Sequence, residues 1–168
     1  RVAAYMPNTI QTVESFLATS AIGAIWSSCS PDFGVNGVIE RFIQIRPSIL
    51  IICDRYYYNG KEINVLERLN EIVKKISSIK KVIIVNYPGK KYINLNHIKS
   101  NKIHYWKDIP NTKVDKIFFE KFDFDHELAI LYSSGTTGKP KCICHRSGGV
   151  LLQHLKEHQL HCEIKPND

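Results

Sequence analysis

No stretch of this 168-residue sequence stays apolar over the roughly 18 residues that a membrane-spanning helix requires. We therefore expect no membrane span. The first ten residues, RVAAYMPNTI, have neither a basic leader nor a long apolar segment, so we expect no secretory signal peptide. Because the chain opens on Arg1 at the start of an expected strand, we interpret it as a piece of a longer polypeptide.

The sequence also lacks an even set of cysteines. Its five cysteines stand at positions 29, 53, 142, 144 and 162, which we expect to be strand or core positions rather than a disulfide framework. Free thiols persist in proteins of reducing compartments. This pattern predicts a cytoplasmic protein.

Arginine is missing from residues 74–121, which hold twelve lysines against three acids, although the net charge of the whole chain is only +7. Lysines interleaved with aromatic residues are found in nucleic-acid-binding faces. Here the lysines are scattered among isoleucines, and the segment has no arginine for bidentate contacts. We therefore interpret it as a solvated, lysine-rich surface and expect no nucleic acid partner.

The sequence does contain an alternation of strand and helix patterns. Strands are expected at 2–6, 24–26, 48–54 and 81–87, and helices over 9–22, 35–45 and 62–76. In the first helix, Val13, Phe16, Leu17 and Ala21 recur at helical spacing. In the second helix, Val38, Phe42 and Ile45 are expected to point inward. Such alternation predicts an α/β fold with an open, mostly parallel sheet and flanking helices.

We expect the chain to form one partial domain with three segments. Residues 1–87 carry the alternating strands and helices, and residues 88–127 form an irregular, lysine-rich segment. Residues 128–168 carry a strand at 128–134, a second strand at 141–145 and a final helix over 148–162.

The stretch LYSSGTTGKPK, residues 131–141, places small hydroxyl side chains, glycines and lysines directly after an apolar strand. A phosphate chain needs donors on several sides, close approach of the backbone and a cation. Glycine permits that approach, serine and threonine donate hydroxyls, and lysine supplies the charge. The candidate phosphate-binding residues are Ser133, Ser134, Gly135, Thr136, Thr137, Gly138, Lys139 and Lys141.

This stretch is not a Walker A loop, which requires G-x-x-x-x-G-K-[ST]. Ser133 stands at the first glycine position, and Pro140 replaces the hydroxyl that would bind Mg²⁺. The Rossmann pattern G-x-G-x-x-G does not fit either. Two common nucleotide-binding classes are thereby excluded.

The string YSSGTTGKPKCICH, residues 132–145, instead resembles the signature of the acyl-adenylate-forming, or AMP-binding, superfamily. Residues 23–47 and 148–162 are most similar to the branch of that superfamily that activates acetoacetate, and RVAAYMPN resembles its early strand. Residues 55–120 are the least distinctive. The resemblance implies a fragment of the large N-terminal domain of such a ligase.

By this resemblance, the enzyme joins acetoacetate to coenzyme A through an acyl-adenylate, with ATP, Mg²⁺ and coenzyme A as substrates and no tightly bound cofactor. The loop from Ser133 to Lys141 would hold the β- and γ-phosphates, and Lys141 would offset charge on the leaving pyrophosphate. The superfamily's later motifs are absent from these residues. We therefore expect no catalytic residue in the chain and no activity from it alone.

The resemblance also implies contacts with coenzyme A. The turn of Pro31, Asp32 and Phe33 would lie along its pantetheine arm, although Pro31 and Asp32 replace two glycines of related acetyl-CoA synthetases. Lys61 would lie against its nucleotide phosphate.

Other interpretations stay open. Another short acid such as acetate is an alternative substrate, and a non-catalytic nucleotide-binding or scaffolding module is an alternative of another class. The tyrosines at 56–58 are expected in a loop beyond a strand, where they line a nucleotide path or cover the sheet edge.

A zinc site is suggested by a cluster of thiols and imidazoles near the end of the chain. Its members are Cys142, Cys144, His145, His154, His158, His161 and Cys162. The cluster lacks C-x₂-C spacing, so we expect no metal. We expect Cys162 to be a buried thiol on the Leu151/Leu155 side of the final helix.

Overall fold

The computed structural model describes residues 1–93, 102–110, 112, 115–133 and 138–168. Its strands are β1 (Val2–Tyr5), β2 (Trp26–Cys29), β3 (Ile49–Cys53), β4 (Arg55–Tyr58), β5 (Lys61–Asn64), β6 (Lys81–Val85), β7 (Ile103–Tyr105), β8 (Glu127–Ser133) and β9 (Lys141–Arg146). Its α-helices are α1 (Ile10–Ala21), α2 (Val35–Ile45), α3 (Leu69–Lys75) and α4 (Ser147–Lys156). Short turns of other helix types are η1 (Leu66–Arg68), η2 (Trp106–Asp108) and η3 (Glu157–His161).

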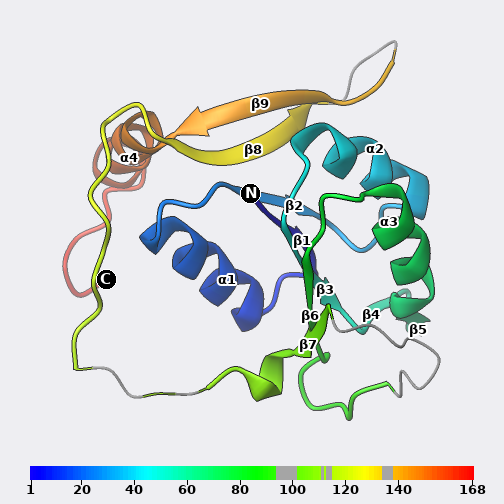
Figure 1. Ribbon diagram of the computed structural model, residues 1–168. Coiled ribbons are helices and arrows are strands. Elements are labelled where there is room, and N and C mark those ends of the chain that lie inside the picture. Colours follow the sequence, from blue (N-terminus) through cyan, green and yellow to red (C-terminus); the bar gives the residue numbers. More distant parts are fainter. Residues whose placement is uncertain (94–101, 111, 113–114, 134–137) are drawn as a thin grey trace.

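The described strands form a seven-stranded sheet in the order β7-β6-β3-β1-β2-β8-β9, beside a separate β4-β5 hairpin. The pairs from β7 to β8 are parallel, and β9 alone runs antiparallel, against β8. Figure 1 shows α1 on one face of this sheet and α2 and α3 on the other. The predicted open, mostly parallel α/β sheet is confirmed.

The core lies between the central strands and the helices α2 and α3. Leu50, Ile52 and Ile84 of β3 and β6 are fully buried, as a parallel strand covered on both faces requires. On α2, the predicted inward residues Val38, Phe42 and Ile45 are buried. The helix expected over 35–45 is therefore confirmed in both its bounds and its face.

Helix α1 has the predicted bounds but not an apolar buried face. Val13 and Leu17 are more than half exposed, whereas Ser15 and Thr19 are buried. The two hydroxyls donate to carbonyls one turn earlier, Ser15 to Gln11 at 2.6 Å and Thr19 to Ser15 at 2.7 Å. Because the helix satisfies these small polar groups itself, they can face the sheet without an outside partner.

Strand β2 begins where the prediction of 24–26 ends. Its polar sequence, Trp-Ser-Ser-Cys, resembles a loop, but it pairs with β1 along its whole length. The buried Ser27 hydroxyl donates to the carbonyl of Ile130 on β8 at 2.8 Å. A hydroxyl can therefore be buried in this strand because its hydrogen-bond acceptor comes from a residue 103 positions later in the chain.

The helix predicted over 62–76 is wrong in its first half. Residues 61–64 form β5, which pairs with β4, and the regular helix α3 begins at Leu69. Asn59 and Gly60 join the two strands with φ of 48° and 74°, the left-handed geometry that an Asn-Gly hairpin turn adopts. The tyrosines at 56–58 therefore lie on a strand and not in a loop.

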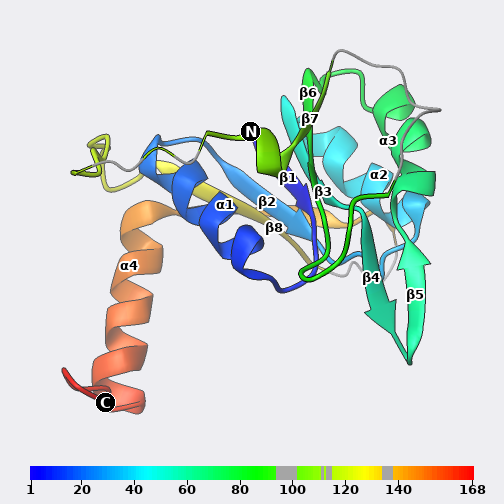
Figure 2. The ribbon, with the colours of Figure 1, turned by 90° about the horizontal axis from the view of Figure 1, so that it is seen from below.

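The last part of the chain projects from the sheet. Strand β9 leads directly into α4, which extends away from the other helices in Figure 2. The helix continues as the π-helical turn η3, and Cys162 beyond it is exposed, as are Leu151 and Leu155. The predicted burial of Cys162 is wrong because, in the described part of the chain, nothing covers this side of the helix.

Candidate functional site: a pocket at the carboxyl ends of the strands

A pocket of about 350 Å³ lies beyond the carboxyl ends of β1, β2 and β3. Parallel strands end at the same edge of a sheet, where α/β proteins bind their ligands. The lining residues come from the chain beyond β1 and the first turn of α1, from the end of β2 and the turn after it, from β4, and from the chain after β6. They are Met6, Pro7, Asn8, Thr12, Ser28, Cys29, Ser30, Pro31, Asp32, Tyr56, Tyr57, Tyr58 and Tyr87.

One wall of the pocket is the turn that follows β2. The Phe33 N–H donates to the Ser30 carbonyl at 3.1 Å, which closes the turn. The Ser30 hydroxyl donates to the Asp32 carboxylate at 3.0 Å. Pro31 and Asp32, two of the predicted coenzyme A residues, thus line the pocket, whereas Phe33 is exposed and is not among the lining residues.

The opposite wall is the β4-β5 hairpin. The rings of Tyr57 and Tyr87 meet edge to face, with centroids 5.0 Å apart, and the Lys90 ammonium lies 5.6 Å from the Tyr57 ring centroid. Lys61, the fourth predicted coenzyme A residue, is exposed and opposite Tyr58 in the hairpin register. It therefore stands beside the wall rather than in the lining.

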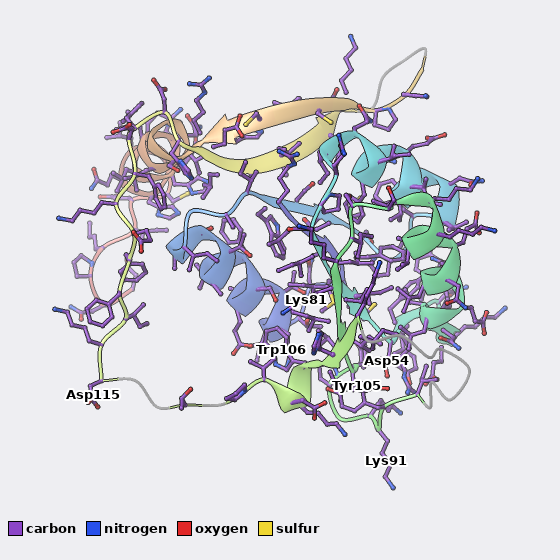
Figure 3. All side chains as sticks on the ribbon, in the orientation of Figure 1. Asp54, Lys81, Lys91, Tyr105, Trp106 and Asp115 are labelled. Carbon is purple, nitrogen blue, oxygen red and sulfur yellow. The ribbon has the colours of Figure 1, made fainter. Side chains whose placement is uncertain are left out.

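A buried carboxylate fixes this hairpin to the sheet. Asp54, fully buried, accepts from the Tyr87 N–H at 2.8 Å and from Arg55 at 3.0 Å. Arg55 also donates to Glu62 on β5 at 3.0 Å and to the Lys91 carbonyl at 2.8 Å. Figure 3 shows Asp54 within the molecule, while the Lys91 side chain extends into solvent.

The network also affects Glu62 electrostatically. A hydrogen bond from Tyr57, followed by the charges of Arg55 and Lys90, lowers the pKa of the Glu62 carboxyl. The carboxylate is therefore ionised at neutral pH and available to Arg55. Asp54, Arg55 and Glu62 were not predicted as site residues, although an Asp at the end of an apolar strand followed by Arg was a usable signal.

The predicted phosphate loop connects β8 to β9. Ser133 ends β8 and stands opposite Lys141, the first residue of β9. Of the other predicted residues, Gly138 and Lys139 are exposed, and Ser134, Gly135, Thr136 and Thr137 lie outside the described residues. The Pro140 carbonyl accepts from Gln44 of α2 at 3.0 Å, which fixes the returning end of the loop.

Arg41 links the loop to the turn after β2. Its guanidinium lies 4.2 Å from the Phe33 ring centroid and 5.7 Å from that of Tyr132, the residue before Ser133. Burial raises the pKa of the Tyr132 hydroxyl, which therefore stays protonated while Ser27 bonds to it at 3.1 Å. Two predicted site segments about 100 residues apart thus contact one arginine, a contact that sequence spacing does not reveal.

The five cysteines divide into two groups. Cys29 and Cys53 are buried, and burial raises the pKa of each thiol to about 12. Cys142 and Cys144 are exposed but lie on β9, so the prediction of core or strand positions is confirmed for four of the five cysteines. It is wrong for Cys162, which is exposed and follows η3. Among residues whose placement is described, no group of three or more His, Cys, Asp and Glu side chains could hold a metal ion.

No helix in the described part of the chain is long and apolar enough to cross a membrane.

The profile of the family described as AMP-binding enzyme matches residues 1–167. The chain belongs to the AMP-binding enzyme family. The resemblance of residues 132–145 to that family's signature is thereby confirmed.

The chain is similar to specific members of the AMP-binding family. It is 46% identical to the acetoacetyl-CoA synthetase of Gallus gallus and 45% identical to the acetoacetyl-coenzyme A synthetase of Rhizobium meliloti, with all of this chain covered in both cases. The solved acetoacetyl-CoA synthetase from Streptomyces lividans superposes with a TM-score of 0.89 at 38% identity, again over the whole chain.

The chain spans about a quarter of the length of these proteins: 26% and 25% of the two curated relatives and 25% of the solved chain. The fold described above therefore corresponds to one part of a larger synthetase in each of them.

Proposed function

We propose that these residues form part of an ATP-dependent acid–CoA ligase that converts acetoacetate, ATP and coenzyme A to acetoacetyl-CoA, AMP and pyrophosphate. The observation that carries the proposal is that the whole of this chain aligns with an acetoacetyl-CoA synthetase at 46% identity. The signature segment lies at the β8-β9 connection. The remaining three quarters of such an enzyme would supply the acyl pocket and the catalytic groups.

The first half-reaction requires charge to be neutralised at the pyrophosphate. A carboxylate oxygen of acetoacetate attacks the α-phosphorus of ATP, and the bond to the β-phosphate oxygen breaks to release pyrophosphate with Mg²⁺. In this proposal Ser133, Ser134, Gly135, Thr136, Thr137, Gly138, Lys139 and Lys141 surround the β- and γ-phosphates. Lys139 and Lys141, at the end of the connection that enters β9, are exposed, which favours this assignment because both ammonium groups can reach an anion.

In the second half-reaction, the thiol sulfur of coenzyme A attacks the acyl carbon and AMP leaves. We assign the turn Pro31–Phe33 and the tyrosine wall of the pocket to coenzyme A, with Lys61 beside its phosphates. A chain-like ligand fits a pocket of about 350 Å³ between two walls. The position of the pocket at the carboxyl ends of the strands supports this assignment.

The proposed organisation follows the three segments expected from the sequence, 1–87, 88–127 and 128–168, as parts of one domain that the rest of the synthetase completes. The five free cysteines support a reducing, cytoplasmic location. Small molecules are the proposed partners, and nucleic acid is not among them.

Carboxylate-dependent exchange of labelled pyrophosphate into ATP tests the proposal in the polypeptide at the length of its relatives. We expect exchange with acetoacetate and little with acetate. Exchange with acetate alone would retain the ligase and replace the substrate. No exchange with any short acid would contradict the ligase and favour a nucleotide-binding module.

A further inference from the structure

Two side chains, Arg68 and Tyr5, converge on two backbone carbonyls of the turn that lines the pocket. Arg68, at the end of η1, donates from Nη1 to the Pro31 carbonyl at 2.9 Å and to the Phe33 carbonyl at 3.1 Å. The Tyr5 hydroxyl, at the end of β1, lies 3.1 Å and 2.5 Å from the same two carbonyl oxygens. Arg68 also donates to the Tyr5 hydroxyl.

The backbone N–H groups of the turn and the carbonyls of Pro31 and Phe33 already have partners within the protein. Pro31 has no N–H, the Asp32 N–H donates to the Ser30 hydroxyl at 3.3 Å, and the Phe33 N–H donates to the Ser30 carbonyl. Because the carbonyls of Pro31 and Phe33 both bond to Arg68 and Tyr5, the exposed Asp32 between them is left on the pocket side. Arg68 and Tyr5 thus orient the turn.

Arg68 also connects the two walls of the pocket. It lies four residues beyond the last residue of β5, and the Val65 N–H just before η1 donates to the Asp54 carbonyl at 2.9 Å. The chain segment that carries Arg68 is therefore fixed to the network that holds the hairpin. Arg68 therefore bonds to the turn on one side of the pocket and belongs to the chain segment that follows the hairpin on the other.

We propose that Arg68 and Tyr5 are positioning residues for the coenzyme A half-reaction, holding the turn Pro31–Phe33 at the width that the pantetheine arm requires. This inference rests on the proposed ligase function. Neither side chain is among the pocket-lining residues, so both act through the turn rather than by contact with the ligand. The adenylation half-reaction does not use this pocket and is expected to be independent of the pair.

The test measures the two half-reactions separately in the polypeptide at the length of its relatives. For Arg68→Met, we expect the KM for coenzyme A to rise about ten- to a hundredfold, as for a displaced binding wall, with acetoacetate-dependent pyrophosphate exchange within about twofold of the parent. Arg68→Lys should recover most of the loss, since one ammonium can still reach these acceptors. Lys75→Met, which removes an exposed cation from α3, is the matched control and should change neither value.

Tyr5→Phe gives a second route to the same answer. Alone it should raise the KM for coenzyme A, and in the Arg68→Met background it should add little, because both changes release the same turn. A KM within about twofold of the parent in both single variants would overturn the proposal. Parallel losses of exchange and coenzyme A use would also overturn it, because they indicate general damage to the fold. Exchange by the unmodified enzyme reports on the ligase function independently.

Discussion

The two ends of this chain differ in how they bury their apolar side chains. The region up to Val85 contributes every buried apolar residue of the described core except Ala129. From Glu127 onward, by contrast, β9 and α4 expose Ile143, Leu151 and Leu152 to solvent. Strand and helix patterns of apolar residues occur in both regions. Such a pattern therefore does not by itself show that the apolar residues are buried.

This contrast bears on the function. The first region builds a pocket from groups that are already fixed by one another, with Asp54 and Arg55 behind one wall and Tyr5 and Arg68 beneath the other. The second region carries the signature segment on a hairpin beside exposed apolar surface. We therefore expect the first region to determine stability, and the second to depend on the further parts of the proposed synthetase.

The largest effect should come from the core of the first region. Phe42→Ala removes a fully buried ring and should lower the free energy of unfolding by about 3–5 kcal/mol. Leu151→Ala, on the exposed face of α4, should change it by no more than about 0.5 kcal/mol in the 168-residue chain. Urea unfolding measures both. Equal losses would show that α4 is packed in solution and would remove the contrast.

The next effect concerns the anchor of the hairpin. Asp54→Ala leaves the Tyr87 N–H without its acceptor and should cost about 1–3 kcal/mol of stability. Glu62→Ala removes an exposed partner of Arg55 and Tyr57 and serves as the control, with a smaller loss of stability than Asp54→Ala. If Asp54→Ala unfolds at the same urea concentration as the parent, the carboxylate does not anchor this wall.

A smaller pair of effects should have opposite signs in the two regions. Gly60→Ala places a Cβ at a φ of 74° and should destabilise the chain by about 1–2 kcal/mol. Gly149→Ala, in α4 with open space around the new Cβ, should stabilise it by about 0.5–1 kcal/mol through helix propensity. Thermal unfolding of the two variants checks the signs, and a gain for Gly60→Ala would refute the left-handed turn.

Thiol chemistry sharpens the same comparison without a substitution. Cys29 and Cys53 should resist iodoacetamide at pH 8, because their buried thiols keep a pKa of about 12, whereas the exposed Cys142 and Cys162 should react. Cys144 is exposed too, but partial burial and the neighbouring Glu127 raise the pKa of its thiol, so it should react more slowly than those two. Since unfolded thiols ionise near pH 8.5, the two buried thiols should also reduce stability as the pH rises above that value. Mass spectrometry after brief labelling reads the sites, and modification of Cys53 in folded protein would contradict its burial.

The sequence predicted those features that depend on local pattern. The apolar β-branched run of β3 and the inward spacing of Val38, Phe42 and Ile45 each identified an element and its buried face. Features set by distant partners were missed. The hydroxyl-rich β2 forms because Ser27 bonds to a carbonyl on β8. Helix α1 faces the sheet through Ser15, Thr19 and the partly buried Phe16, while Val13 and Leu17 are exposed.

The site divides in the same way. The signature hairpin and the turn Pro31–Phe33 were recognisable as motifs, and the structure places the turn in a pocket. The groups that hold that pocket were not recognisable, because Tyr5 and Arg68 meet across 63 residues of chain. The Asn59-Gly60 pair was a readable local signal for a hairpin that the helical spacing of the following apolar residues obscured.

The central claim is that the β8-β9 connection neutralises the leaving pyrophosphate of an adenylation reaction. Single-turnover formation of the acyl-adenylate by Lys141→Ala, in the polypeptide at the length of its relatives, tests it most directly, with Lys80→Ala as the exposed-lysine control. We expect the rate to fall about a hundredfold or more, with acetoacetate binding unchanged, as for loss of a charge that stabilises the transition state. Equal rates for the variant and its parent would contradict the claim.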